Sequence, residues 1–262
     1  MAAHSQNDDE ERIVERVRFF FEPAGFTVTK IPRSDREERP DLAVEGHAER
    51  TLIEIKTKGD DPDEDLRKWA ILKSGGVFSK SVPVGPRNRL SSILAKASKQ
   101  LSHAVVTGDF RLAWIRTVGP NAQLHWDRLR ASLYGAQQVM DFYDGAMVTD
   151  CFYFHDCPFF RYRELLDAAV IECDSDLQLC VNEFSPRYSS FIRARCCDVL
   201  RAGLLDPNQM EAEGLIYRLD SSADRSNEQT KLAALKAKYG LKNVHAMHFQ
   251  HHSAEAVVRD RP

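Results

Sequence analysis

Two short strand-like segments joined by a turn most constrain what this chain can fold into. Residues 40–44 form a brief apolar run opened by Pro-Asp, and residues 52–58 alternate between polar and apolar side chains. The segment between them is polar and contains a glycine, so the pattern predicts a β-hairpin. The hairpin places Asp41, at the start of one strand, beside Glu54 and Lys56 near the end of its neighbour.

Two carboxylates and an ammonium group on adjacent strands are suited to holding a divalent cation and orienting a water. Mg²⁺ prefers carboxylate and carbonyl oxygens and keeps several waters of its own. The alternative interpretation is a solvated charged hairpin, in which Glu54 and Lys56 face water.

The spacing of these residues resembles that of the PD-(D/E)xK nuclease superfamily. Pro40-Asp41 is followed, after twelve residues, by Glu54-Ile55-Lys56. The resemblance implies an α/β fold with a restriction-endonuclease-like core, a central mixed sheet flanked by helices. It also implies that Asp41, Glu54 and the carbonyl of Ile55 bind Mg²⁺, for which Mn²⁺ can substitute, and that Lys56 orients or helps deprotonate the attacking water.

A predicted helix over residues 8–22 offers a further carboxylate. Its apolar residues fall on one stripe, Glu10 lies near the middle of that stripe, and Glu15 points away from it. Archaeal-type Holliday-junction resolvases, of the same superfamily, have a glutamate at this point of their first helix, and Glu10 with its following apolar residues is similar. We therefore expect Glu10 to be a catalytic or metal-binding residue. The alternative is that Glu10 serves only the helix dipole.

Charge is distributed unevenly along the chain. Residues 66–108 contain no Asp or Glu and eight Lys or Arg residues, although the whole chain has a net charge of −3. Such a block is typical of a polyanion-binding surface, and the alternative is a solvated basic surface. Lys96, Lys99, Gln100 and Leu101 also resemble the Lys and Gln-Leu that follow the Glu-x-Lys strand in many of these nucleases. The expected nucleic-acid-binding residues are Lys73, Lys80, Arg87, Arg89, Lys96, Lys99 and Gln100.

The first half of the chain follows the order helix, three strands, helix, strand, which is the core order of this superfamily. The acidic residues 59–65 are predicted to be a solvated turn, and residues 74–89 a flexible loop. The remaining predictions are a first strand at 26–31, helices at 66–73 and 89–106, and a strand at 111–118.

The second half is predicted as alternating helices and strands. The expected helices are 123–141, 160–172, 190–202 and 227–239. The expected strands are 146–154, which would extend the same sheet, followed by 177–184, 214–219 and 244–250. These patterns divide the chain into a nuclease-like domain, residues 1–155, and a C-terminal α/β or α+β region, residues 156–262, whose role the sequence leaves open.

Composition indicates a cytoplasmic protein without a membrane segment. No apolar run approaches the ~20 residues that cross a bilayer, and the N-terminus lacks a secretory h-region. The six cysteines are therefore expected to be reduced thiols, and their spacings match neither a zinc site nor a cysteine-bound iron–sulfur cluster. Four histidines between residues 245 and 252 are expected to be strand and tail residues.

These features predict a Mg²⁺-dependent deoxyribonuclease, with an endonuclease favoured over an exonuclease and RNA as an alternative substrate. Because many enzymes of this class act as dimers, a homodimer is an option. The competing hypothesis is a catalytically inactive nuclease fold that acts as a nucleic-acid-binding or assembly module. The acidic net charge and the unassigned second half favour that hypothesis, whereas the complete set of site residues argues against it.

Overall fold

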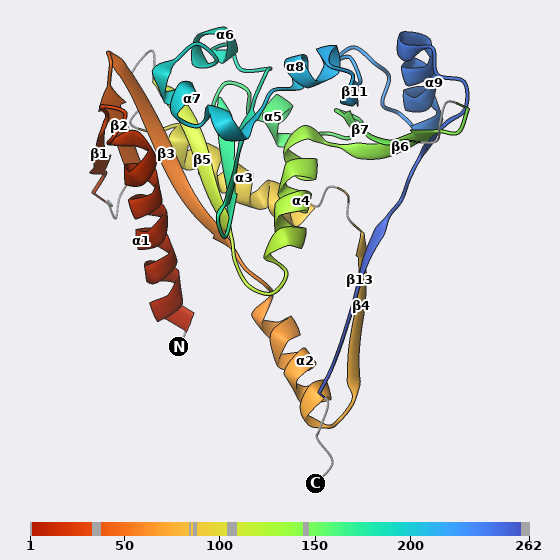
Figure 1. Cartoon of the computed structure of the whole chain (residues 1–262), viewed down its shortest axis with the longest axis horizontal. Coiled ribbons are helices and arrows are strands. Elements are labelled where there is room, and N and C mark those ends of the chain that lie inside the picture. The colour runs from red at the N-terminus through yellow and green to blue at the C-terminus, as the bar shows by residue number, and fades with distance from the viewer. Residues whose placement is uncertain are drawn as a thin grey trace.

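A computed structural model of the chain describes residues 2–32, 38–83, 85, 88–103, 109–143 and 147–257. Its largest element is a seven-stranded sheet with the order β1-β2-β3-β5-β8-β9-β10 (Figure 1). Strands β3, β5 and β8 are parallel, β10 is parallel to β9, and the other neighbours are antiparallel. The strands are β1 (Thr27–Lys30), β2 (Leu42–Gly46), β3 (Glu49–Lys58), β5 (Phe110–Thr117), β8 (Ala168–Cys173), β9 (Asp176–Val181) and β10 (Leu204–Leu205).

The predicted hairpin is present as the antiparallel pair β2–β3, in which Leu42 lies opposite Ile53. Its alternating side chains are divided between two cores, one on each face of the sheet. Leu52 belongs to the core under α3 (Asn88–Leu101) and α4 (Ala122–Tyr134). Ile53 and Ile55 belong to the core under α1 (Ala2–Phe21) and α7 (Arg195–Val199). The fold is therefore mixed α/β, with a large central mixed sheet flanked by helices.

The predicted first helix is confirmed and extends further toward the N-terminus. Its stripe of Ile13, Val14, Val17 and Phe21 is fully buried against the sheet. Helix α3 is also confirmed, but it ends at Leu101, before the expected end at residue 106, because the chain turns at Ser102 and His103. Residues 104–108 lie outside the described residues.

The predicted helix over 123–141 is only half correct. Helix α4 stops at Gly135, whose φ of 55° is left-handed and where a side chain would collide with the His155 carbonyl. The chain then enters a separate four-stranded sheet with the order β11-β7-β6-β12, so β7 does not extend the main sheet as expected. These strands are β6 (Gln137–Asp141), β7 (Val148–Phe152), β11 (Ile216–Arg218) and β12 (Val244–Ala246).

The second half differs from the prediction mainly where apolar runs are short. The expected helix over 160–172 is instead the short α5 (Pro158–Arg161) and the buried strand β8, because a short apolar run fits a buried strand as well as a helix. The expected helix over 190–202 is broken into α6 (Tyr188–Phe191), α7 and a 3₁₀ turn, η1 (Arg201–Gly203). Helix α9 (Glu228–Tyr239) confirms its prediction and begins at the N-cap Asn227. Beyond the expected boundary at residue 155, β8, β9 and β10 lie in the same sheet as β1, β2, β3 and β5.

A third unit projects from the body of the molecule at the bottom of Figure 1, and we call it the arm. It consists of α2 (Pro62–Lys73), β4 (Val77–Pro83) and β13 (Gln250–Ala256), the two strands pairing antiparallel over seven residues. The prediction of a flexible loop over 74–89 is therefore wrong for β4. The partner strand lies near the other end of the chain, so no local pattern indicated the pairing.

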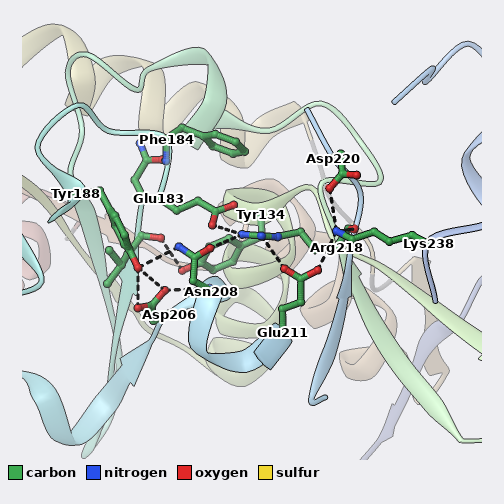
Figure 2. Close-up of polar contacts among 12 residues, drawn as sticks. Tyr134, Glu183, Phe184, Tyr188, Asp206, Asn208, Glu211, Arg218, Asp220 and Lys238 are labelled. Atoms are coloured by element: carbon green, nitrogen blue, oxygen red, sulfur yellow. Dashed lines mark hydrogen bonds and ion pairs between the residues drawn. The ribbon is translucent and has the colours of Figure 1, made fainter. Parts of the chain in front are cut away.

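The two larger sheets are joined by a polar network around Arg218, at the end of β11 (Figure 2). Arg218 forms an ion pair with Glu183, just after β9. It also forms one with Glu211 of α8 (Pro207–Ala212), at 2.6 Å. Lys238 of α9 binds Glu211 at 2.8 Å and Asp220 at 2.8 Å, so the network reaches from the main sheet to the last helix.

Two composition-based expectations have structural counterparts. All six cysteines are buried free thiols. Among the described residues, none of the helices combines the length and apolar character needed to cross a membrane.

Candidate active site

The structure brings the predicted catalytic residues together around one pocket of about 210 Å³. The pocket lies at the start of β2, where β3 extends past its pairing with β2 and remains paired with β5 on its other side. The residues that line it are Glu10, Asp41, Glu54, Ile55, Lys56, Thr57 and Gln100.

The pocket exists because β2 pairs with only the first half of β3. The register of the hairpin ends with Leu42 opposite Ile53, so none of the described residues forms a partner strand for the edge of β3 beyond Ile53 on this side. Asp41 takes the place of that partner, since its Oδ2 accepts a hydrogen bond from the backbone N–H of Ile55 at 2.8 Å. Because the N–H and C=O of one strand residue point the same way, the Ile55 carbonyl is directed to the same open edge.

Asp41 is itself held by backbone hydrogen bonds on both sides. Its N–H donates to the Ile53 carbonyl at 3.1 Å, and its carbonyl accepts from the Ile31 N–H at 2.9 Å. The carboxylate is therefore positioned by the sheet rather than by a flexible loop, which is the arrangement that a precise site requires.

Lys56 lies between two oxygen acceptors. Its ammonium group pairs with Oε1 of Glu54 and donates to Oε1 of Gln100 at 2.7 Å. Gln100 comes from α3, on the face of the sheet that also bears Glu54 and Lys56, so the helix orients the lysine from above the strand. A positioned ammonium group of this kind can hold a water or a phosphate oxygen at the pocket.

The two carboxyl groups repel each other in a largely dry environment. The Glu54 side chain is fully buried, and this burial, together with the nearby charge of Asp41, raises its pKa to about 8. The pKa of Asp41 is also raised, chiefly by burial and further by the charge of Glu10, although the hydrogen bond from Ile55 and the Lys56 charge oppose this.

The oxygen set at this pocket fits a hard divalent cation. Oε2 of Glu54 is buried and has no hydrogen-bond partner among the described residues, and the one ammonium group of Lys56 does not neutralise both Glu54 and the partly buried Asp41. Across the described ranges, no group of three or more His, Cys, Asp or Glu side chains is arranged to hold a metal ion. The set is thus limited to Asp41, Glu54 and the Ile55 carbonyl, and one or two carboxylates are what Mg²⁺ usually takes from a protein.

The first helix contributes as the apolar stripe indicated. Glu10 is half-buried, lines this pocket and also lines the adjoining pocket beside Asp41 and Leu42. Glu15 is exposed, on the outer side of α1. The two glutamates therefore differ in the way that the sequence predicted.

Several of the basic residues in segment 66–108 have acidic partners, which the absence of Asp and Glu from that segment did not indicate. Acidic residues from outside the block reach into it: Lys68 pairs with Glu255, Lys80 with Glu64, and Lys99 with Glu38 at 3.1 Å. The interpretation of eight basic residues without counter-charges is therefore wrong.

The remaining basic residues have different positions. Lys96 is exposed on α3 and Lys73 is exposed on α2, whereas the Gln100 side chain accepts a hydrogen bond from Lys56. Arg87 lies outside the described residues, as does the side chain of Arg89.

Sequence reasoning missed a polar cluster between the segment after β3 and the start of α4. The acidic segment 59–65 was interpreted as a solvated turn, but Asp60 accepts hydrogen bonds from Nδ2 of Asn121 at 2.9 Å and lies 3.0 Å from Nε2 of His125. Burial acts to raise the pKa of Asp60, yet these hydrogen bonds lower it overall. Because both partners come from the start of α4, no local signal in the sequence could have revealed the cluster.

Thr57, which lines the pocket, was also missed, since its alternation places it on the face opposite Lys56.

Comparisons with protein-family models, with curated proteins and with solved structures found no match to this chain. The protein's own residues define a mixed α/β fold with a carboxylate-rich pocket at the open edge of a central strand.

Proposed function

We propose that this protein is a metal-dependent nuclease that hydrolyses phosphodiester bonds in DNA, at the pocket formed by Asp41, Glu54 and Lys56. The observation that carries the proposal is the convergence of a fully buried and a partly buried carboxyl group, a lysine and a backbone carbonyl at one open strand edge. The resemblance of these residues to the PD-(D/E)xK pattern adds support, and RNA is the alternative substrate.

The residues have separate roles in this proposal. Asp41, Glu54 and the Ile55 carbonyl hold the cation, and Glu10 lies close enough to influence the charge of Asp41. A bound Mg²⁺ supplies charge neutralisation at the scissile phosphate and lowers the pKa of a water. Lys56, held by Gln100, orients the attacking water, and burial of the carboxyl groups strengthens every charge interaction at the pocket.

Purified protein tests the proposal directly. Supercoiled plasmid and a single-stranded DNA circle should be cut in Mg²⁺ or Mn²⁺ and stay intact with EDTA, whereas Asp41→Ala and Glu54→Ala proteins should be inactive but folded. Cutting of a closed circle identifies an endonuclease. Full activity of Asp41→Ala protein would refute the assignment of this site, and an inactive wild type that still binds DNA would favour a non-catalytic nucleic-acid-binding module.

A further inference from the structure

Helix α2 presents an apolar and basic face to solvent. Trp69 is 56% exposed and Leu66, one turn earlier, is 69% exposed. Lys73, one turn after Trp69, is exposed on the same side, and Arg67 is exposed on the flank of the helix beyond Leu66. A large aromatic side chain that is exposed together with basic residues is a common feature of nucleic-acid-binding surfaces.

The opposite face of α2 is already used within the arm. Leu72 is buried, Lys68 pairs with Glu255 of β13, and Lys80 of β4 pairs with Glu64. Within α2, which is described throughout, Asp63 in the first turn is the one acidic side chain that is exposed. Beyond that first turn, the free face of α2 therefore carries only apolar and positively charged groups.

The arm is fixed at its base by two contacts with α4. Before α2 begins, Asp60 binds Asn121 and His125. At the end of β4, the Pro83 carbonyl accepts hydrogen bonds from the Arg128 guanidinium at 2.6 Å and 3.1 Å. These contacts hold the orientation of the arm relative to the main sheet.

The arm extends from the end of β3 that carries Glu54 and Lys56. Helix α2 begins at Pro62, after a short connection from the end of β3 at Lys58. In the view of Figure 1, α2 lies on the side of the β4–β13 ribbon that faces α1, whose N-terminal half contributes Glu10 to the pocket. A nucleic acid bound at the pocket would therefore extend toward the free face of α2.

We propose that this face of α2 binds a single-stranded segment of the nucleic acid, with Trp69 stacked on an unpaired base and Arg67 beside the phosphate backbone. The inference deepens the proposed nuclease function and rests on it for the position of the substrate. Stacking on an exposed aromatic ring needs a base face that a continuous duplex does not offer, so the preferred substrate contains a single-stranded portion.

The competing occupant is a second copy of the chain, because Leu66 and Trp69 would also suit an apolar interface. Charge favours the nucleic acid. Arg67 and Lys73 flank the apolar residues, and two copies of this face would bring these like charges together.

Trp69 is both the proposed contact and a natural probe. The chain has three tryptophans, and the other two, Trp114 and Trp126, are 0% and 8% exposed. Titration of the full chain in EDTA with a single-stranded oligonucleotide should quench the tryptophan emission. A blunt duplex of the same sequence should quench it less.

Substitutions at two exposed aromatic residues separate the contact from general surface effects. Trp69→Leu should remove the quench and raise Kd for the single strand by about tenfold or more. Trp69→Phe should retain most of the affinity because it keeps a stacking ring. Phe142→Ala, on the four-stranded sheet at a site 51% exposed, should leave Kd unchanged. Arg67→Ala should lower the salt dependence of log Kd by about 0.7, the value for one single-strand phosphate contact.

The outcomes discriminate between the two proposals. An unchanged Kd in folded Trp69→Leu protein would overturn the inference. A change in tryptophan emission that grows with protein concentration without nucleic acid, and disappears in Trp69→Leu, would assign the face to a second copy instead. Binding with a quench but no cleavage in Mg²⁺ would refute the nuclease proposal and support α2 as a nucleic-acid-binding surface. Cleavage without any change in Trp69 emission would support the nuclease and refute the proposed contact with α2.

Discussion

At the residue scale, Glu10 and Glu15 provide an internal comparison on one helix. Glu10 lines the pocket and its charge acts on Asp41, whereas Glu15 is exposed. We predict that Glu10→Gln lowers the single-turnover rate of DNA cleavage about 10- to 100-fold, the usual effect of removing a group that supports metal ligands. DNA affinity should change little, because the basic surface is intact.

Glu15→Gln is the matched control, since it removes the same charge from the same helix outside the pocket. Its cleavage rate should equal that of the wild type. Equal, near-normal rates for both variants would remove Glu10 from the site. Because α1 begins at Ala2, Glu10 lies beyond the first turn, and an effect on the helix dipole would not explain its position either.

Glu54 predicts an unusual dependence of stability on pH in the metal-free protein. Burial and the Asp41 charge raise its pKa from 4.5 to about 8 in the folded state. The folded protein then keeps a proton that the unfolded chain loses, so the contribution to stability is complete below pH 4.5 and is lost as the pH rises toward about 8. Glu54→Gln should therefore gain thermal stability relative to the wild type at about pH 8 and not at about pH 4.

Thermal denaturation in EDTA at the two pH values measures this difference. A gap in Tm between the variant and the wild type that does not change with pH would show that Glu54 is ionised in the folded protein. Mg²⁺ should narrow the gap at the higher pH, since it binds the wild-type carboxylate and not the amide.

The residues that sequence could identify are those whose partners lie within a few elements along the chain. Asp41, Glu54 and Lys56 follow from one hairpin, and Glu10 from the periodicity of one helix. The pairing of Lys80 with Glu64 and the burial of Asp60 against His125 depend on how the arm and α4 pack, and neither spacing nor charge pattern contains that information.

At the element scale, the difference between local and distant partners explains why the sequence did not predict β4. The hairpin β2–β3 is local and its register follows from alternation, but β4 pairs only with β13, near the far end of the chain. Within the part of the chain that the structure describes, the ribbon has two strands and no third, and most of its side chains are exposed, so its stability depends on α2 and on its contacts with α4.

We predict that the backbone amides of β4 and β13 exchange with solvent deuterium much faster than those of β5, which is paired with β3 on one side and β8 on the other. Arg128→Met removes two hydrogen bonds to the Pro83 carbonyl. It should therefore further increase the rate of amide exchange in β4 and β13 without changing the rate in β5. Hydrogen exchange measured by mass spectrometry resolves these segments. Equal protection of β4 and β5 would contradict the prediction and show that the ribbon is covered in solution.

At the scale of the whole molecule, the main sheet gathers strands from both halves of the chain. Strands β8 and β9 lie beside β5, although sequence patterns placed them in a C-terminal region. The order of strands in a sheet depends on contacts between distant segments. The hydrophobic pattern within a segment could therefore indicate a strand, but not which strands lie next to it in the sheet. The four-stranded sheet is a second layer with its own small core beneath α9.

The Arg218 network is the main polar connection described between these two sheets, and its removal should weaken the whole fold. The side chains of Arg218, Glu183 and Glu211 are 22%, 8% and 18% exposed. Deleting the guanidinium therefore leaves the poorly solvated Glu183 without its cation, whereas Glu211 keeps Lys238. We predict that Arg218→Met lowers the free energy of unfolding by about 3–5 kcal/mol, the usual cost of breaking a buried ion pair from one side.

Arg161→Met is the matched control, because Arg161 and Asp156 form an ion pair that is 53% and 65% exposed, and its loss should not be measurable. Denaturation by urea, followed by circular dichroism, compares the two variants. The double variant Arg218→Met with Glu183→Gln should recover part of the lost stability, since it removes the carboxylate that the single change leaves unpaired. A single variant as stable as the wild type would mean that the sheets are held by apolar packing alone, and that this network is solvated in the folded protein.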